Sequence, residues 1–242
     1  MAVSKVGQAN AVRDWYDSAY ASLGFAAQRR YPNEELLRFM GRHFFGIERA
    51  QRASMKVLEL GCGSGANLWM IAREGFQTYG LDLSPEALRL CKIMLESWGE
   101  IASLEAGSIL NLPYASDMFD AVVDVFSTYC VNEVEFRKCL DEVARVTKAG
   151  GLYFSYSPSK NSEAFQTYQP ATKLDGSTLN GISRPTSPYY GNSYPFRFIS
   201  QEEYADLLSS RGFRVISSER IGRTYRDCAE YFEFVSLAAQ KV

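Results

Sequence analysis

Short apolar strands alternate with helical segments between residues 55 and 157, and this alternation limits the possible fold more than any other feature of the sequence. A strand that is followed by a helix and a further strand forms a parallel pair with a crossover connection. Because the strands are nearly continuous apolar runs, we expect both faces of the sheet to be buried. The expected strands are 56–60, 78–81, 101–105, 119–126 and 152–157.

Helix start and stop signals support this pattern. Ser84 is a suitable N-cap and Pro85 suits the first helical position. Helices are also expected over 66–74 and 133–148. A further helix, over 200–210, begins with a capping-box pattern and ends before a glycine.

Two final strands, at 213–217 and 231–239, have no clear helix between them and are expected to form an antiparallel hairpin. The predicted fold class is therefore α/β, a Rossmann-like, doubly wound, seven-stranded, mostly parallel sheet with an antiparallel edge hairpin, in a single domain.

Four parts of the chain differ in character. The stretch at 158–198 is rich in aromatic residues and proline and is too long for a plain loop, so we expect it to be functional. The parts are an N-terminal helical lid at 1–50, a core at 51–157, an aromatic-rich substrate-binding insert at 158–198, and the last helix and edge hairpin of the core at 199–242.

Composition excludes several classes of protein. A net charge of −2 gives no basic excess for nucleic acid. The five cysteines are scattered without a C-x-x-C pair, so no metal site is expected. We find no uncharged apolar run of the roughly 18 residues that a membrane helix needs, and expect a cytoplasmic protein. The oligomeric state is not readable from the sequence.

A glycine-rich loop after the first strand of the core is the strongest functional signal. Gly61, Gly63 and Gly65 lie between a strand and a helix, where glycines let backbone N–H groups approach a ligand closely. Asp82 ends the next strand, where a carboxylate can accept both hydroxyls of a ribose. Since Gly61-x-Gly63-x-x-Ala66 also fits the dinucleotide fingerprint, an NAD(P)-binding oxidoreductase is a serious alternative.

Further motifs favour one of these classes. In their order they resemble the class I S-adenosylmethionine (SAM)-dependent methyltransferases of the small-molecule type, and the resemblance covers about three quarters of the chain. The motifs are Glu59-x-Gly61-x-Gly63-x-Gly65, Gly80-Leu81-Asp82-Leu83-Ser84, Leu112-Pro113-Tyr114, Phe119-Asp120, Gly150-Gly151 and the segment from Phe198 to Phe213. A SAM-binding protein without transferase activity remains a third class.

The resemblance implies roles for several residues around SAM. Gly61, Cys62 and Gly63 would line its methionine part, Glu59 would lie near its amino group, and Asp82 would hold the ribose. Leu83 would flank adenine, with Ser108 and Ile109 also at the base, and Phe126 would lie near the methyl donor. Arg30 could pair with the SAM carboxylate from the lid. Aromatic faces attract a sulfonium cation, and the candidates for that contact are Tyr16, Tyr20, Tyr31, Phe126 and Tyr129. For Trp15 we favour an ordinary core role.

The acceptor is expected to be a small molecule held by the insert and the N-terminal helix. The predicted substrate-binding residues are Tyr129, Tyr168, Tyr194 and Arg197. With the cations Lys160, Lys173 and Arg184, the aromatic insert suits a sugar, a nucleotide-sugar or an aromatic metabolite. The methyl group would go to an oxygen or a nitrogen atom of this acceptor. The single histidine, His43, reads as a helix-edge residue. No catalytic residue is assigned, and a base could be Asp14, Asp17, Glu133 or a tyrosine.

Overall fold

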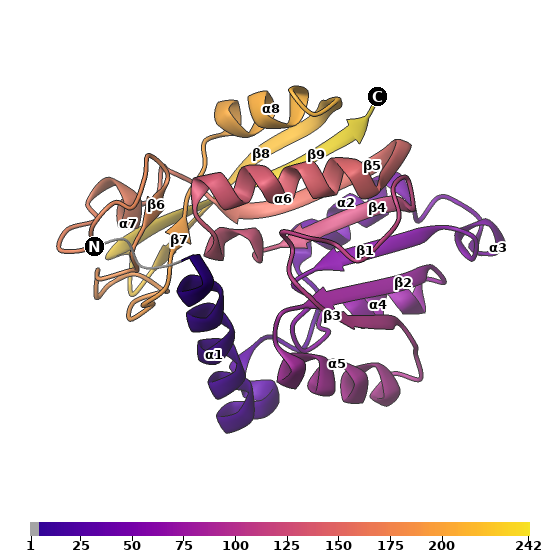
Figure 1. The fold of residues 1–242 in the computed structure, drawn as a ribbon, viewed down its shortest axis with the longest axis horizontal. Coiled ribbons are helices and arrows are strands. Elements are labelled where there is room, and N and C mark those ends of the chain that lie inside the picture. Colours follow the sequence, from indigo (N-terminus) through magenta and orange to yellow (C-terminus); the bar gives the residue numbers. More distant parts are fainter. Residues whose placement is uncertain (1–4) are drawn as a thin grey trace.

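The computed structural model describes residues 5–242, with side chains from residue 11 onward. Seven strands form one sheet in the order β3-β2-β1-β4-β5-β9-β8 (Figure 1). The strands from β1 to β5 pair in parallel, and β9 is antiparallel to both β5 and β8. The predicted sheet is thus confirmed. The bounds are β1 (Lys56–Leu60), β2 (Gln77–Asp82), β3 (Ser103–Ala106), β4 (Phe119–Val125), β5 (Thr147–Pro158), β8 (Phe213–Tyr225) and β9 (Glu230–Lys241).

Helices cover both faces of the sheet, because successive residues of the buried strands point to opposite sides. Val57 of β1 lies in one apolar cluster with Phe39 of α2, and the next residue, Leu58, lies in another with Phe136 of α6. Figure 1 shows α6 in front of the sheet and α2 behind it. The helices are α1 (Lys5–Leu23), α2 (Glu34–His43), α3 (Arg49–Arg52), α4 (Leu68–Arg73), α5 (Pro85–Ser97), α6 (Glu133–Val146), α7 (Glu163–Gln166) and α8 (Gln201–Ser209), with short 3₁₀ turns η1 (Gly24–Ala27) and η2 (Thr128–Cys130).

The predicted helix starts are confirmed at atomic detail. Ser84 accepts a hydrogen bond from the Ala87 N–H, with Pro85 in the first turn of α5. Both halves of the capping box at the start of α8 are present. A second capping box, between Asn132 and Glu135 at the start of α6, was not predicted from the sequence.

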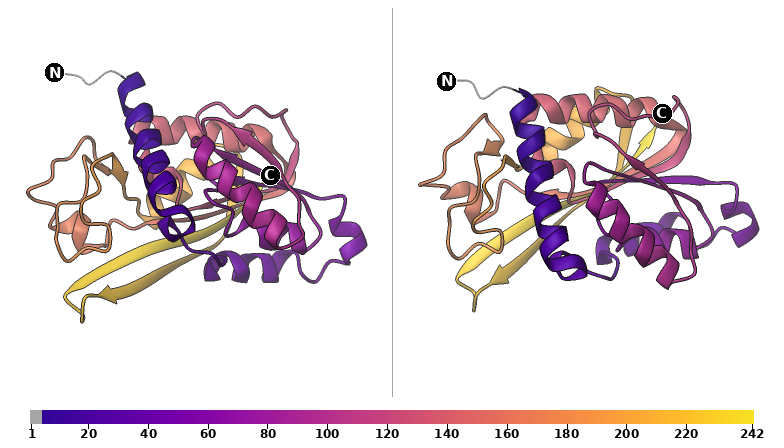
Figure 2. Two further views of the ribbon diagram at one scale, coloured as in Figure 1. Left: turned by 90° about the horizontal axis from the view of Figure 1, so that it is seen from below. Right: turned by 60° about the horizontal axis from the view of Figure 1, so that its bottom comes forward.

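The edge hairpin is longer than predicted. The strands β8 and β9 have 13 and 12 residues, and they extend well past the rest of the sheet (Figure 2). The insert at 158–198 packs on this extension and is ordered, with α7 and a two-stranded sheet of β6 (Thr178–Leu179) and β7 (Phe196–Arg197). The fully buried Glu230 of β9 pairs with Arg184 of the insert, so the hairpin is the support on which the insert folds.

Among residues 5–242, no helix combines the length and the apolar character that crossing a bilayer would require.

Candidate active site

The glycine loop lies at the carboxyl end of β1, beside β4, where the strand order of the sheet reverses. Ligands bind at such a point in open α/β sheets. Gly61 and Gly63 have φ angles of +61° and +53°, which side chains other than glycine rarely adopt. A Cβ on Gly61 would lie 2.4 Å from the Cβ of Ser127, in the loop after β4. Glycine therefore lets the two loops meet at the crevice.

Asp82, at the end of β2, closes the second side of the crevice. Its carboxylate accepts the N–H of Gly63 at 2.8 Å and the N–H of Ser84 at 2.9 Å. Burial raises the pKa of Asp82, and these backbone hydrogen bonds oppose the shift. Each carboxylate oxygen keeps a further lone pair for a ligand hydroxyl.

Glu59 lies under the glycine loop with 2% of its surface exposed. One carboxylate oxygen accepts a hydrogen bond from Nδ2 of Asn67 at 2.6 Å, and the other oxygen, Oε2, has no hydrogen-bond partner. Burial raises the pKa of Glu59 to about 8. A cationic ligand group at Oε2 would satisfy this atom and favour the charged carboxylate.

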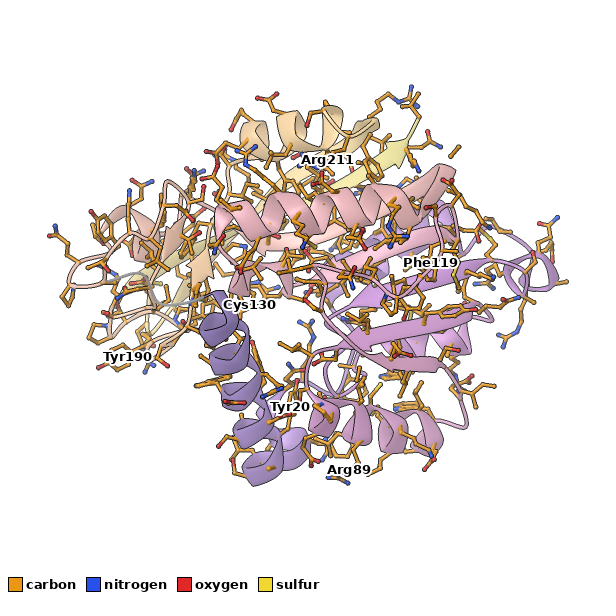
Figure 3. All side chains as sticks on the ribbon, viewed as in Figure 1. Tyr20, Arg89, Phe119, Cys130, Tyr190 and Arg211 are labelled. Carbon is orange, nitrogen blue, oxygen red and sulfur yellow. The ribbon has the colours of Figure 1, made fainter. Side chains whose placement is uncertain are left out.

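A first cavity runs from the glycine loop to the carboxyl end of β3; we call it the cofactor cavity. It brings together Gly61, Asp82 and Leu83 with the predicted adenine residues Ser108 and Ile109. Its outer wall comes from α1 and the loop after β4, and Figure 3 marks these sides at Tyr20 and Cys130. The cofactor cavity is thus closed by parts of the chain more than 100 residues apart.

Phe126 forms the junction to a second cavity. Its φ angle is +60°, a conformation that is strained for an aromatic residue. Asp124 holds this backbone in place: its buried carboxylate accepts the N–H groups of Ser127 and Thr128, both of their hydroxyls, and the Ser155 hydroxyl. The strain at Phe126 is therefore maintained by five hydrogen bonds to one carboxylate.

The second cavity, which we call the aromatic cavity, opens from the Glu59 side of the glycine loop toward the insert. It shares Tyr16, Gln28, Gly61 and Phe126 with the cofactor cavity. Its aromatic lining comes from α1, the sheet and the insert, and consists of Trp15, Tyr16, Phe126, Tyr129, Tyr156, Tyr189, Tyr190 and Tyr194. Figure 3 labels Tyr190 on the insert side.

Three tyrosine hydroxyls meet in the aromatic cavity; we call them the tyrosine triangle. The Tyr16 and Tyr129 hydroxyl oxygens are 2.5 Å apart, those of Tyr129 and Tyr194 2.6 Å, and those of Tyr16 and Tyr194 3.0 Å. The three residues come from α1, η2 and the insert. The structure thus brings the predicted Tyr16, Tyr129 and Tyr194 to one point.

Arg197, predicted to bind substrate, lies elsewhere. It is 1% exposed, its guanidinium lies 3.3 Å from the Phe136 ring centroid, and its Nη2 approaches Thr128. Burial lowers the pKa of Arg197. The prediction was wrong because the sequence does not show that β7 turns this side chain under α6, away from the aromatic cavity.

Tyr168 likewise lies outside both cavities. The remaining cations of the insert, Lys160, Lys173 and Arg184, do so too. Lys173 lies over the rings of Phe165 and Tyr168, 4.7 and 4.9 Å from their centroids. Lys160 pairs with Glu203, and Arg184 pairs with Glu230. Lys160 and Arg184 thus fix the insert to α8 and the hairpin, and Lys173 packs within the insert, so none of the three lines the aromatic cavity.

Arg29, rather than the predicted Arg30, lines the aromatic cavity. Arg30 lines a surface hollow with Tyr31 and Trp98, and its guanidinium lies over Phe25. Arg29 instead lines the aromatic cavity next to Glu59. Tyr31 is 66% exposed, so it is not placed to contact a sulfonium.

Of the residues considered as bases, tyrosines line the aromatic cavity, whereas Asp14, Asp17, Glu133 and His43 do not. His43 lines a separate hollow beside Gly150, at the opposite end of the sheet. Asp17 accepts the Ser84 hydroxyl, and Glu133 pairs with Arg137. Among the described side chains, Glu59 is the one carboxylate lining this cavity, and His43 is not near it.

Sequence reasoning missed several residues of the site. Trp15, expected in the core, is 43% exposed and lines the aromatic cavity. Gln28 reaches over the glycine loop, where its Oε1 is the nearest atom to a Cβ built on Gly63. The signal for Asp124 was visible, since it is a charge inside an apolar strand.

Comparison with known proteins finds similarity to methyltransferases. Residues 57–151 match the family described as "Methyltransferase domain". The chain is similar to norajmaline N-methyltransferase of Rauvolfia serpentina (30% identical over 123 residues, 48% of this chain and 41% of the relative). It is also similar to fatty-acid O-methyltransferase of Mycolicibacterium smegmatis (38% over 110 residues, 43% and 37%). The chain thus spans less than half the length of these curated relatives.

A solved structure extends the likeness over the whole fold. The 1,6-didemethyltoxoflavin-N1-methyltransferase of Burkholderia thailandensis, with bound 1,6-didemethyltoxoflavin and S-adenosylhomocysteine, superposes with a TM-score of 0.62 at 17% identity, over 100% of this chain and 92% of that one. The fold and the glycine loop define an α/β protein of the Rossmann-like class. Within that class, residues 57–151 match a methyltransferase domain, and the fold is similar to that of a solved methyltransferase.

The residues present fit SAM as the cofactor. The unpartnered Glu59 Oε2 suits an ammonium group, and Asp82 keeps lone pairs for ribose hydroxyls. These two features would contact different parts of SAM, its ammonium group and its ribose.

Proposed function

We propose that this protein transfers the methyl group of SAM to a small organic acceptor held in the aromatic cavity. The observation that carries the proposal is the junction of the two cavities. Gly61 and Phe126 line both, so a ligand on the glycine loop would present its reactive group to the aromatic cavity. Bound SAM supplies a sulfonium methyl group that is already activated for displacement.

The chain's own residues would bind and orient the two reactants. Asp82 would accept the ribose hydroxyls, and Leu83 and Ile109 would contact adenine, with Ser108 offering a hydroxyl. Glu59 would receive the ammonium group. Alignment of the reactants and exclusion of water are the main contributions that a protein can make to such a displacement.

Of the predicted lid at 1–50, the part from α1 to Gln28 would lie over the cofactor, whereas α2 covers one face of the sheet and residues 1–4 lie outside the described residues. Tyr20 of α1 and Gln28 support this role, because both lie directly over Gly63. Tyr16 of the same helix reaches the tyrosine triangle, so the lid would cover both cavities. In the same proposal, 51–157 would bind the cofactor and the insert at 158–198 would bind the acceptor. The last helix and edge hairpin at 199–242 would complete the core.

Arg29 would pair with the carboxylate of SAM in place of Arg30. We expect Arg29→Ala to weaken SAM binding about 5- to 20-fold, because a charge-assisted hydrogen bond is lost. Arg30→Ala is the matched control and should change the dissociation constant less than twofold. Calorimetric titration measures both. Equal effects of the two variants would contradict this placement.

An aromatic metabolite fits the second cavity better than a nucleotide-sugar. The insert cations that would hold a diphosphate are engaged with Glu203, Glu230 and aromatic rings instead. The Burkholderia structure holds 1,6-didemethyltoxoflavin beside S-adenosylhomocysteine, which supports a small organic acceptor. The names of the curated relatives include both N- and O-methyltransferases, so the methylated atom must come from other observations.

A parallel titration tests the proposed function. SAM, S-adenosylhomocysteine and NAD are added separately to the purified chain, and binding is followed by calorimetry. We expect the two sulfur compounds to bind in the micromolar range and NAD to show no saturation. Saturable NAD binding without SAM binding would restore the oxidoreductase alternative. SAM binding without product formation across acceptor panels would favour a binding protein.

A further inference from the structure

We infer that the acceptor is a planar conjugated molecule whose nucleophilic atom needs no proton removed before methyl transfer at neutral pH, as in a phenolate oxygen or an unprotonated ring nitrogen. This inference rests on the proposed function and names the substrate class of the same site. It depends on three observations: the shape of the aromatic cavity, the absence of a base among its described lining residues, and the tyrosine triangle.

The walls of the aromatic cavity suit a flat ligand. Phe126 stacks between two tyrosines: its ring centroid lies 4.2 Å from that of Tyr129 and 4.9 Å from that of Tyr189, with interplanar angles of 29° and 26°. Trp15 and Tyr190 are partly exposed at this cavity. Aromatic faces favour offset stacking with another ring. A planar acceptor could therefore add to an existing stack beside the methyl donor.

No ionisable group of the aromatic cavity is placed to remove a proton from the acceptor. Among the described lining residues, the ionisable groups are tyrosines, Arg29, Glu59 and the buried Cys62. Burial raises the pKa of Tyr16 and Tyr129 well above 10, and that of Tyr194 to about 12. These tyrosines stay protonated near neutral pH. Glu59 lies at the methionine end, fixed to Asn67, and would face the cofactor.

The tyrosine triangle supplies hydrogen-bond donors instead. Protonated hydroxyls can bond one another in a closed ring, and each can turn its proton to a stronger acceptor. A delocalised anion or a ring nitrogen is such an acceptor, since hydrogen bonds to charged groups are stronger than neutral ones. The triangle would therefore hold the acceptor by an atom of its conjugated system and leave the nucleophile facing Phe126.

The chemical step then balances without a protein base. The acceptor's lone pair forms the new bond to the methyl carbon while the carbon–sulfur bond breaks, and that electron pair stays on sulfur. An ionised phenol becomes a neutral methyl ether. A neutral ring nitrogen becomes a methylated cation, or loses a ring proton to water afterwards.

Matched probe acceptors test the inference. 4-Nitrophenol ionises near neutral pH, whereas 4-nitrobenzyl alcohol has the same nitroaromatic ring and needs a base. Cyclohexanol tests the planar shape. Each is incubated with the chain and SAM, and methylated product is quantified by mass spectrometry. We expect 4-nitrophenol to react at least 100-fold faster than either alcohol, with a rate that follows its own ionisation.

Two variants connect the effect to the tyrosine triangle. Tyr129→Phe and Tyr194→Phe should each lower kcat/KM for 4-nitrophenol about tenfold, because one donor to an anion is lost. Tyr231→Phe is the control: its hydroxyl donates to Glu233 at 2.8 Å on β9, outside both cavities. It should stay within twofold of the wild type.

Two results would overturn the inference. One is methylation of 4-nitrobenzyl alcohol or cyclohexanol as fast as 4-nitrophenol. The other is no reaction with 4-nitrophenol in a protein that still binds S-adenosylhomocysteine. Loss of S-adenosylhomocysteine binding itself would count against the proposed function, so the two failures are distinguishable.

Discussion

Asp124→Ala is expected to destabilise the protein by about 3–5 kcal/mol. This is the cost of leaving several buried hydrogen-bond donors and the buried Arg197 guanidinium without the carboxylate. The wild-type carboxylate is fully buried and accepts five hydrogen bonds. Its removal leaves the donors of Ser127, Thr128 and Ser155 unpaired. It also removes the carboxylate that opposes the lowering of the Arg197 pKa by burial.

The same substitution should release the backbone at Phe126. Without the carboxylate, nothing comparable holds a φ of +60° against its strain. Urea unfolding measures the stability, and SAM titration measures the site. Asp124→Asn keeps the shape and one acceptor oxygen, so it should lose less stability while still weakening SAM binding.

A surface carboxylate provides the control for Asp124. Asp141 pairs with Arg211 and has 62% of its side chain exposed. Exposed pairs contribute little, so Asp141→Ala should cost less than about 1 kcal/mol. A loss for Asp124→Ala that is no larger than for this control would contradict the assigned role.

Glu59→Gln is expected to weaken SAM binding about 10- to 100-fold and to abolish its pH dependence. In the free protein, burial raises the pKa of Glu59 from 4.5 to about 8, so the carboxyl is mostly protonated at pH 7. An ammonium group at the unpartnered Oε2 favours the charged form. Binding should therefore release about one proton at pH 7, and affinity should rise with pH up to about 8.

The ionisation of Glu59 makes stability fall with rising pH, whereas it makes SAM affinity rise. Its pKa is higher in the folded than in the unfolded chain, so the folded chain holds one more proton between about pH 4.5 and 8. The free energy of unfolding of the ligand-free protein then falls as pH rises through this window, by up to about 1.4 kcal/mol per pH unit. Below pH 4.5 both states are protonated, and the contribution is fully present. Glutamine cannot ionise, so at pH 8 the ligand-free variant should be the more stable protein.

Calorimetry in two buffers of different ionisation enthalpy counts the released proton. The control is Glu96→Gln, since Glu96 is an exposed carboxylate on α5. It should bind SAM with the wild-type affinity and proton count. Unchanged proton release in Glu59→Gln would assign the titration to another group.

The local sequence predicted most of the fold because the signals for its elements are local. Apolar runs, the caps at Ser84 and Ser200, and the absence of a helix before β9 depend on neighbouring residues, and each was confirmed. The length of the hairpin was not predictable. Beyond the sheet, the outer half of β8 is largely exposed and polar, and the insert packs on β9 there.

The site divides in the same way. The sequence by itself determined the glycine loop, Asp82 and Glu59, because a strand, a tight turn and a helix position these residues within 25 positions of one another. Only the tertiary structure decided which tyrosines meet, that Arg29 rather than Arg30 lines the cavity, and that Arg197 is buried under α6. The direction of a side chain on a lid or an insert depends on contacts with residues up to 178 positions away, as for Tyr16 and Tyr194, and no local pattern encodes them.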